Sequence, residues 1–344
     1  MLTLSIVIPV RNGERTLPAC FAALDQLNPA PAEIIFVDNG STDRTPELLS
    51  AFQRTPRPLP VIVLQERTLG ASAARNTGIR AATGDLVVFT DADCAPRRDW
   101  LRHVGAGFAE AEIGAVAGSV TGVFDRSFCE LFSSLYTLQT AGGSLVYRAW
   151  TPWSGGFPTA NLAVRRSLLL KLEGFDEGKT IYGEDYDLCA RLYREGAAIL
   201  YQPDAVVIHH HRATVKGVFR QAYGFGRGHA YLLHRHHPAG LWLEFPRKAV
   251  EWSWAPLPGW IDVASPDKKL ALLLMSAILI RPLIALLPLY LCWLAYDCVQ
   301  RAKSAGVQVS LLDAFGLAWM LLLKAGAMTA GRWSGSIQYR TCCL

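Results

Sequence analysis

Short apolar runs alternate with longer segments of helical periodicity over residues 1–90. The apolar runs predict buried β-strands at 5–9, 33–37, 61–64 and 86–90. The segments between them predict helices at 15–27, 41–52 and 71–82, the second of which begins with capping residues. Strands that are apolar almost throughout and alternate with helices predict an α/β fold, in which helices cover both faces of a mainly parallel sheet.

The hydrophobic pattern changes in the last third of the chain. The run from Leu270 to Tyr296 contains one charge, Arg281, and a second run covers 311–330. Each is long enough to cross about 30 Å of hydrocarbon as a helix. Tryptophans 252, 254 and 260 precede them beside basic residues, as is typical of a membrane interface.

These runs predict membrane attachment and leave its form open. A charged arginine followed by Pro282 interrupts the first run, and both residues disfavour a continuous spanning helix. One interpretation is a transmembrane hairpin, and another is a set of shorter helices that lie in the interface. A second soluble helical domain is the third, because buried core helices can show similar runs.

Composition narrows the class of protein. The chain has 344 residues, of which 51% are hydrophobic and 18% charged, with a net charge of +5. These values argue against a disordered or fibrous chain and predict no nucleic-acid partner. The eight cysteines form no Cys-x-x-Cys pair, so we expect free thiols rather than a zinc ribbon. Neither a P-loop nor a dinucleotide-binding glycine motif follows the first strand.

Polar residues follow three of the four predicted strands. Arg11 and Asn12 follow the first strand, Asp38 the second, and Asp91-Ala-Asp93 the fourth. Ligands bind beyond the carboxyl ends of the strands in such sheets. Two carboxylates one residue apart can converge on a hard divalent cation, although a single aspartate also fits a turn or a helix cap. The sequence therefore predicts a Mg²⁺ or Mn²⁺ site at this edge.

Several motifs together resemble those of inverting glycosyltransferases of family 2, over residues 3–230. They are Ser5-Ile-Val-Ile-Pro-Val-Arg-Asn12, Glu33-Ile-Ile-Phe-Val-Asp-Asn-Gly-Ser-Thr-Asp43, Gly70-Ala-Ser-Ala-Ala-Arg-Asn-Thr-Gly78, Asp91-Ala-Asp93, Thr159-Ala-Asn-Leu-Ala-Val-Arg-Arg166, Gly174-Phe-Asp-Glu177, Gly183-Glu-Asp-Tyr-Asp187 and Pro203-Asp-Ala-Val-Val-Ile-His-His-His211. The resemblance implies a GT-A fold for a catalytic domain at 1–235. The hydrophobic pattern adds an amphipathic or interfacial linker at 236–268, a membrane-associated hairpin at 269–330 and a tail at 331–344.

The resemblance also implies roles for individual residues. Nucleotide-sugar binding falls to Pro9, Val10, Arg11, Asp38, Gly70, Arg75, Asp91 and Asn161. The metal ligands are Asp93 and Asp91, together with His209 or His211. The catalytic base is Asp185, with Glu184 beside it; acidic residues are also favoured at a helix start for structural reasons. For the histidines, polar residues at a strand end are the alternative.

The expected reaction is a single displacement, in which a sugar passes from a nucleotide-diphosphate donor to a hydroxyl of a lipid-linked or cell-surface glycan acceptor. A divalent metal stabilises the leaving diphosphate and a carboxylate accepts the proton of the hydroxyl. We expect the protein at the inner or plasma membrane, with its catalytic domain in the cytosol. The alternatives are a Mg²⁺-dependent nucleotidyltransferase and a non-catalytic nucleotide-sugar-binding membrane protein.

Two further expectations concern residues 221–237. The segment Gln221-Ala-Tyr-Gly-Phe225 departs from the Gln-x-x-Arg-Trp signature of processive family members, which favours the addition of a single sugar. The three glycines of Gly224-Phe-Gly226-Arg-Gly228 predict a loop, and the histidines at 229, 234, 236 and 237 predict a solvated or interfacial stretch.

Overall fold

The computed structural model describes residues 2–123, 127–137, 143–151, 154–177, 182–210, 214–237, 239–245, 248–252 and 258–344. The chain divides into two compact units. Unit 1 contains residues 1–123 and 138–211, and unit 2 contains 124–137 and 212–344. Each unit is described below by itself.

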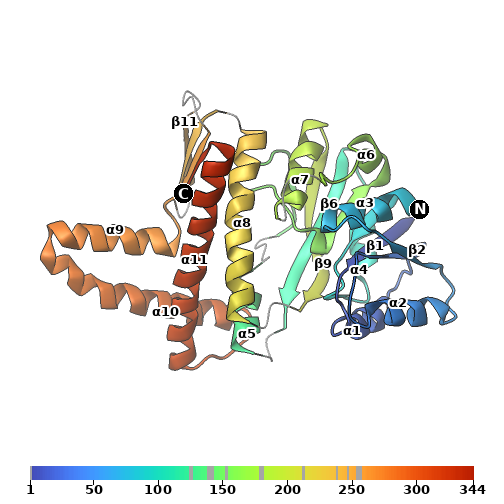
Figure 1. Ribbon diagram of the computed structural model, residues 1–344, viewed down its shortest axis with the longest axis horizontal. Coiled ribbons are helices and arrows are strands. Elements are labelled where there is room, and N and C mark those ends of the chain that lie inside the picture. The colour runs from blue at the N-terminus through green and yellow to red at the C-terminus, as the bar shows by residue number, and fades with distance from the viewer. Residues whose placement is uncertain are drawn as a thin grey trace. The chain divides into compact units, whose positions relative to one another are not determined.

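Unit 1 is built on one mixed sheet (Figure 1). Its strands are β1 (Leu4–Val10), β2 (Glu33–Asp38), β3 (Val61–Gln65), β4 (Leu86–Phe89), β5 (Cys94–Pro96), β6 (Ile113–Gly122), β7 (Leu145–Tyr147), β8 (Leu162–Arg165) and β9 (Ala198–His209). They lie in the order β3-β2-β1-β4-β8-β6-β9-β5, and β7 pairs with β9. The first four strands are parallel, as predicted, while β8 is antiparallel to both of its neighbours.

Helices cover this sheet. They are α1 (Leu17–Leu24), α2 (Thr45–Arg54), α3 (Ala71–Ala81), α4 (Trp100–Ala106), α6 (Arg166–Lys171) and α7 (Glu184–Arg194), with a 3₁₀ turn, η1, at Thr159–Asn161. Alternate residues of β1 enter two separate cores: Ile6 and Ile8 belong to one, and Val7 to the other. Burial on both faces explains why the predicted strands are apolar at nearly every position.

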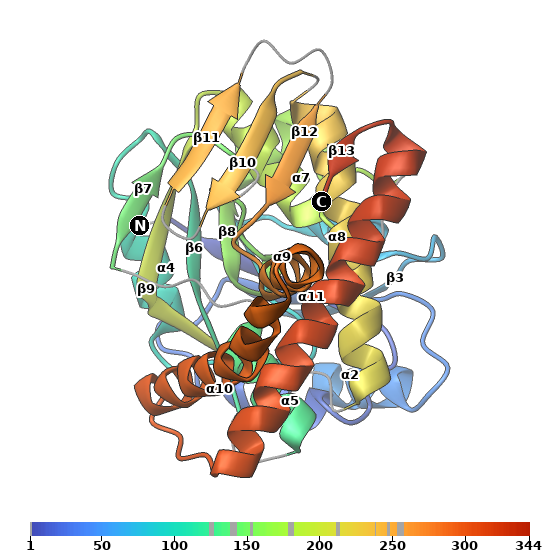
Figure 2. The ribbon, with the colours of Figure 1, turned by 90° about the vertical axis from the view of Figure 1, so that its left-hand side faces the viewer.

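Unit 2 is mainly helical. It contains α5 (Phe128–Tyr136), α8 (Val215–His236), α9 (Pro266–Leu279), a 3₁₀ turn η2 (Arg281–Ala285), α10 (Leu286–Ser304) and α11 (Leu311–Tyr339). A small sheet, visible in Figure 2, adds the strands β10 (Leu241–Phe245), β11 (Lys248–Trp252), β12 (Gly259–Asp262) and β13 (Cys342–Cys343). The predicted interfacial linker 236–268 thus supplies three of these strands.

The boundary between the units differs from the expected catalytic domain of 1–235. It falls at 211, because α8 packs along α11 and belongs to unit 2. The expected loop at 224–228 is also corrected, since these glycines lie inside α8. A Cβ atom at Gly226 would overlap the carbonyl oxygen of Met328, and one at Gly331 would overlap that of Tyr223. The glycines therefore serve close contact between two helices rather than a turn.

This close contact yields a prediction for stability. The substitution Gly226→Ala forces α8 away from α11, and we expect it to lower the free energy of unfolding by about 1–3 kcal/mol. Gly326→Ala is the matched control, because Gly326 lies in α11 and has nothing within 4 Å of an added Cβ. Because alanine has a better helix propensity than glycine, Gly326→Ala should leave the free energy of unfolding unchanged or raise it by up to about 1 kcal/mol. Thermal denaturation in detergent compares the two, and equal melting temperatures would contradict this account.

His229 and His236 of α8 differ from the solvated stretch that the sequence predicts, since His236 is buried, whereas His234 is exposed as predicted. The Nδ1 atom of His229 accepts a hydrogen bond of 3.3 Å from Arg332 Nε, and its ring lies 5.0 Å from that of Trp260. Arg332 is itself buried and donates to Asp262 at 3.2 Å. His229 is therefore part of a polar network within unit 2.

Among the described residues of unit 2, two helical segments are long and apolar enough to cross a membrane, by length and composition. They are 281–304 and Leu311–Tyr339, and only 17% and 28% of the residues in their most apolar stretches are buried. The Arg281-Pro282 pair does break the first predicted run, since α9 ends at Leu279 and α10 begins at Leu286. Large apolar side chains are left exposed, among them Leu279 at 86% and Ile337 at 84%.

Candidate active site

The loop after β4 carries the Asp91-Ala-Asp93 motif at the carboxyl edge of the parallel strands. The loop ends in β5, which pairs with β9 so that Cys94 lies opposite His209. The backbone N–H of His210 donates to the Asp93 carbonyl at 2.8 Å, and that of Cys94 donates to the Asp91 carbonyl at 3.0 Å. The end of β9 therefore fixes the loop that presents both carboxylates.

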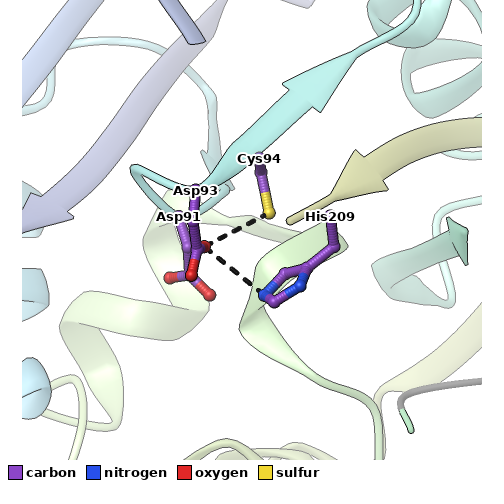
Figure 3. A group of neighbouring side chains, drawn as sticks. All are labelled: Asp91, Asp93, Cys94 and His209. Carbon is purple, nitrogen blue, oxygen red and sulfur yellow. Dashed lines mark hydrogen bonds and ion pairs between the residues drawn. The ribbon is translucent and has the colours of Figure 1, made fainter. Parts of the chain in front are cut away.

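Four potential metal ligands converge here, as Figure 3 shows. Asp91, Asp93, Cys94 and His209 each offer one atom, and these atoms lie within 4.8 Å of one another. The Nε2 atom of His209 is 3.4 Å from Asp93 Oδ1. Carboxylate oxygens and one imidazole suit Mn²⁺, and the carboxylates alone suit Mg²⁺. Of the two histidines named by sequence, His209 joins the group and His211 lies outside the described residues.

Cys94 is a member of this group that the sequence did not predict. Burial is the largest cause that raises the pKa of its thiol well above the usual value, and the negative charges of Asp93 and Asp91 add to the shift. The thiol therefore stays protonated at neutral pH and is a poor ligand for a hard cation. Its position directly after the aspartates, at the start of a strand, was the available signal.

Arg75 links the two acidic parts of the site. Its guanidinium lies 3.1 Å from Asp91 Oδ1 and 3.0 Å from Glu184 Oε1, and its side chain is only 6% exposed. Although burial alone would lower it, the charges of Asp91 and Glu184 raise the pKa of Arg75 above its usual value. The helix α3 positions this side chain, beginning after Gly70, whose φ of +144° suits glycine.

Asp185 lies beside this ion pair, in the first turn of α7. Burial and the neighbouring Glu184 charge raise the pKa of Asp185 to about 7, while Arg75 acts in the opposite direction. The backbone N–H of Tyr186 donates to Asp185 Oδ1 at 2.9 Å. A carboxyl group that titrates near neutral pH is suited to accept a proton during catalysis.

Neighbouring bonds hold the start of α7 in place. The buried carboxylate of Asp187 accepts a hydrogen bond of 2.8 Å from Arg191, which also donates to the carbonyls of Leu172 and Gly174. Asn76 on α3 binds the same segment, through both backbone groups of Phe175. These structural contacts connect α3 with α7, so that Arg75 and Asp185 arrive at the same edge of the sheet.

The residues predicted to bind the nucleotide lie at the ends of β1 and β2. Asp38 is buried and its Oδ1 accepts from the Ser41 backbone N–H at 3.1 Å. Pro9 is half-buried and Arg11 is exposed, but the Val10 side chain belongs to the core, so only its backbone can contact a ligand.

Asn39 is a further residue at this edge that the sequence analysis did not single out. Its Nδ2 donates to the carbonyls of Glu66 and Thr68, and its Oδ1 accepts from Gly70 N–H at 2.7 Å. It therefore connects the end of β2 to the loop between β3 and α3 and holds Gly70 against the residue that follows Asp38.

Asn161 lies in the interior of unit 1, which corrects the expectation that it contacts the donor. Its Oδ1 accepts from Trp100 Nε1, and its Nδ2 donates to the carbonyls of Ser119 and Ala205, all at 2.8 Å. The side chain is 1% exposed and both of its N–H donors are used within the sheet. We therefore leave Asn161 out of the proposed site.

Comparisons with known proteins agree with this geometry. Residues 5–172 match the profile described as "Glycosyl transferase family 2". This part of the chain belongs to family 2. A "pre-mycofactocin glycosyltransferase" of Mycobacterium tuberculosis is 32% identical over 238 residues, which cover 67% of this chain and 48% of the relative. The chain thus spans about half the length of that curated relative.

Two further proteins are similar over different lengths of the chain. An undecaprenyl-phosphate 4-deoxy-4-formamido-L-arabinose transferase of Serratia proteamaculans is 41% identical over 93 residues, which are 26% of this chain and 28% of the relative. A mannosyltransferase of Pyrobaculum calidifontis, solved with GDP-Man and Mn²⁺, superimposes with a TM-score of 0.57 at 20% identity. That comparison covers 97% of this chain and 87% of the other. The family 2 domain has the GT-A fold that the sequence predicted.

Proposed function

We propose that this protein is an inverting glycosyltransferase that uses a nucleotide-diphosphate sugar. The observation that carries the proposal is the link that Arg75 makes between Asp91 of the predicted metal site and Glu184, beside the predicted base Asp185. A transfer of this kind must stabilise charge on the diphosphate and remove a proton from the acceptor, and this site has groups for both tasks.

The residues present fit a divalent metal. Asp91, Asp93 and His209 would hold Mg²⁺ or Mn²⁺, because these three side chains offer two carboxylates and one imidazole within 4.8 Å. When bound, the ion supplies Lewis-acid stabilisation of the leaving diphosphate. The structural neighbour was solved with Mn²⁺ and GDP-Man, which supports the same class of donor for this fold.

Asp185 acts as the base. Its carboxylate takes the proton from the acceptor hydroxyl, whose oxygen forms a bond to the anomeric carbon. The bond between this carbon and the diphosphate oxygen breaks on the opposite face, so the configuration inverts and the nucleoside diphosphate leaves with the electron pair. Arg75 holds Glu184 in place and neutralises part of the negative charge around Asp185.

The acceptor in this proposal is lipid-linked. One relative is named as acting on undecaprenyl phosphate, and unit 2 presents large exposed apolar side chains on α10 and α11. An acceptor held at a membrane would meet a catalytic unit that is anchored at the same surface. Because nucleotide sugars are cytosolic, we place the catalytic unit on the cytosolic side of the membrane.

Nucleotide binding tests the donor site directly. Detergent-purified protein is heated with UDP, GDP, dTDP or CMP, each with Mn²⁺ and with EDTA. A nucleotide at about 100 times its dissociation constant should stabilise the fold by about 2.7 kcal/mol. We expect a shift in melting temperature with one diphosphate, in the presence of Mn²⁺ only. The same shift in EDTA would contradict the metal site. Once the nucleotide is identified, transfer from the matching nucleotide sugar is assayed for a product with inverted configuration.

The raised pKa of Asp185 predicts how the rate depends on pH. A base works only when deprotonated, so kcat/KM should fall up to tenfold for each pH unit below about 7 and level off above it. The rate is measured at saturating Mn²⁺ over the range in which the protein stays folded. A profile that is flat from about pH 5 to 8 would contradict a base with this pKa.

A further inference from the structure

The apolar side chains of α11 that face outward form one stripe. Leu312, Phe315, Trp319, Leu323, Trp333 and Ile337 are exposed, and their spacing of mostly three or four residues places them on one side of the helix. The opposite side contains Ala314, Leu317, Gly331 and Gly335, which are buried within unit 2. A helix that crossed a bilayer alone would have no such packed side, so α11 must be considered together with its neighbour.

That neighbour, α8, argues against a bilayer-spanning α11. The two helices run in the same direction, because Gly226 lies against Met328, and Ala230 lies against Gly335. When this pairing is continued toward the N-terminal ends of both helices, the exposed Arg220 of α8 is level with Lys324 in the middle of α11. If α11 crossed the membrane, α8 would carry this charge and that of Lys216 into the hydrocarbon, which is strongly unfavourable.

The helices α9 and α10 form a hairpin of a different character. Figure 1 shows them extending together from α11 and meeting at η2. From Leu270 to Leu279, and again from Leu286 to Tyr296, neither arm contains a charged residue on any side. The stretch in α10 has returned to the level of Pro266 by Tyr290, and the stretch in α9 is about 15 Å long at about 1.5 Å per residue. That is close to half of the about 30 Å of a bilayer's hydrocarbon core.

Polar contacts gather at the base of this hairpin. Asp267 of α9 accepts a hydrogen bond of 2.6 Å from Thr329 of α11, and Tyr290 donates to the Pro266 carbonyl at 2.8 Å. The ammonium of Lys269 lies 5.7 Å from the centre of the Trp293 ring. Lysine and tryptophan side by side are typical of the level of lipid headgroups. The most exposed apolar side chains of the hairpin are Ile278 and Leu279, at the end of α9 nearest the tip.

We propose that unit 2 binds a single leaflet of a lipid bilayer and does not span it. The α9–α10 hairpin enters the leaflet, and the outward stripe of α11 lies along the boundary with the headgroups. This arrangement replaces the transmembrane hairpin that the sequence allowed at 270–296 and 311–330. Arg281 at the tip opposes insertion, and its long side chain and local water lower that cost. The proposal does not depend on the chemistry of unit 1.

The side of the membrane on which residues 305–310 lie distinguishes the two arrangements. Gln308→Cys and Arg54→Cys place single exposed thiols on this loop and on unit 1, in a background where the exposed Cys292 and Cys342 are serines. Sealed vesicles with the cytosolic face outward are treated with a membrane-impermeant maleimide. We expect both thiols to be labelled equally. Labelling of Gln308→Cys only after the vesicles are permeabilised would show a spanning hairpin and overturn the proposal.

Flotation with phospholipid vesicles, with and without anionic lipid, tests the hairpin itself. The double substitution Ile278→Glu and Leu279→Glu places charges on side chains that are 78% and 86% exposed, so the fold of unit 2 should survive. For the double variant we expect at least a tenfold loss of the vesicle-bound fraction and an unchanged melting temperature in detergent. The variant Arg281→Leu should bind the vesicles more strongly than the unmodified protein. Leu170→Glu, at an exposed leucine of unit 1, is the control and should bind normally.

Two outcomes of this experiment would overturn the proposal. Unchanged flotation of the double variant would show that the hairpin does not contact lipid. A change in oligomeric state in place of vesicle binding would assign the apolar face to a second copy of this chain. Nucleotide-dependent stabilisation, measured on the same samples, reports on unit 1 alone and therefore separates a failure of this proposal from a failure of the proposed function.

Discussion

Asp185→Asn should abolish glycosyl transfer while nucleotide binding stays intact. The amide cannot accept the proton of the acceptor hydroxyl, and loss of a general base costs about 10²–10⁴-fold in rate. The fold should tolerate the change, because the Asp185 side chain already accepts its bond from Tyr186 N–H with an oxygen that asparagine retains. The turnover number and the Mn²⁺-dependent thermal shift with the donor nucleotide are the two measurements.

Asp204→Asn provides a matched control for this substitution. Asp204 is exposed on β9, in the same unit, and lies outside the site. Its asparagine variant should have the turnover number of the unmodified protein. Normal turnover by Asp185→Asn would remove this residue from the mechanism, and loss of nucleotide binding along with turnover would show that its role is structural.

Arg75→Met should lower both stability and activity. It leaves the carboxylates of Asp91 and Glu184 without the buried cation that joins them. Removing one partner from a buried ion pair costs about 3–5 kcal/mol, because the remaining charges stay poorly solvated. We expect a lower melting temperature, and a kcat/KM profile whose acidic limb moves to higher pH. The limb moves to higher pH because Arg75 lowers the pKa of Asp185 in the unmodified protein, so that its removal lets this pKa rise further.

Two further variants serve as comparisons for Arg75→Met. Arg75→Lys keeps the charge but cannot reach both carboxylates with a planar fork, so its loss of stability should be smaller than that of Arg75→Met. Arg102→Met removes an arginine that is 65% exposed and paired with Asp99 on the surface. Such a pair contributes about 0–1 kcal/mol, so its melting temperature and pH profile should barely change. An unshifted acidic limb in Arg75→Met would contradict the electrostatic link to Asp185.

The sequence predicted the first half of the sheet well, for a physical reason. Each of β1 to β4 is a short apolar run between helices, and burial on both faces leaves a strong signal in the residues themselves. The antiparallel β8, whose partners β4 and β6 are far apart in the sequence, gives no such local signal. The short β5 depends on its pairing with β9, which only the folded chain reveals.

The site was predictable where function depends on residue type and unpredictable where it depends on distant contacts. Asp91 and Asp93 could be named from their position after a strand. That Arg75 joins Asp91 to Glu184 could not, because 109 positions separate Arg75 from Glu184. The family resemblance suggested a ligand contact for Asn161, although its side chain is hydrogen-bonded to a buried indole and two carbonyls. The glycines at 224–228 suggested a loop, because close contact between helices requires the same residue type.

The position of α5 decides how the protein can be divided for expression. The helix comes from residues 128–136, before unit 1 is complete, yet Phe132 and Leu135 are buried in a core that belongs to unit 2. A fragment that simply stops at residue 211 would keep α5 without its partners and display those side chains to water. A soluble catalytic fragment therefore needs two changes, a new end at 211 and a short polar linker in place of 124–137.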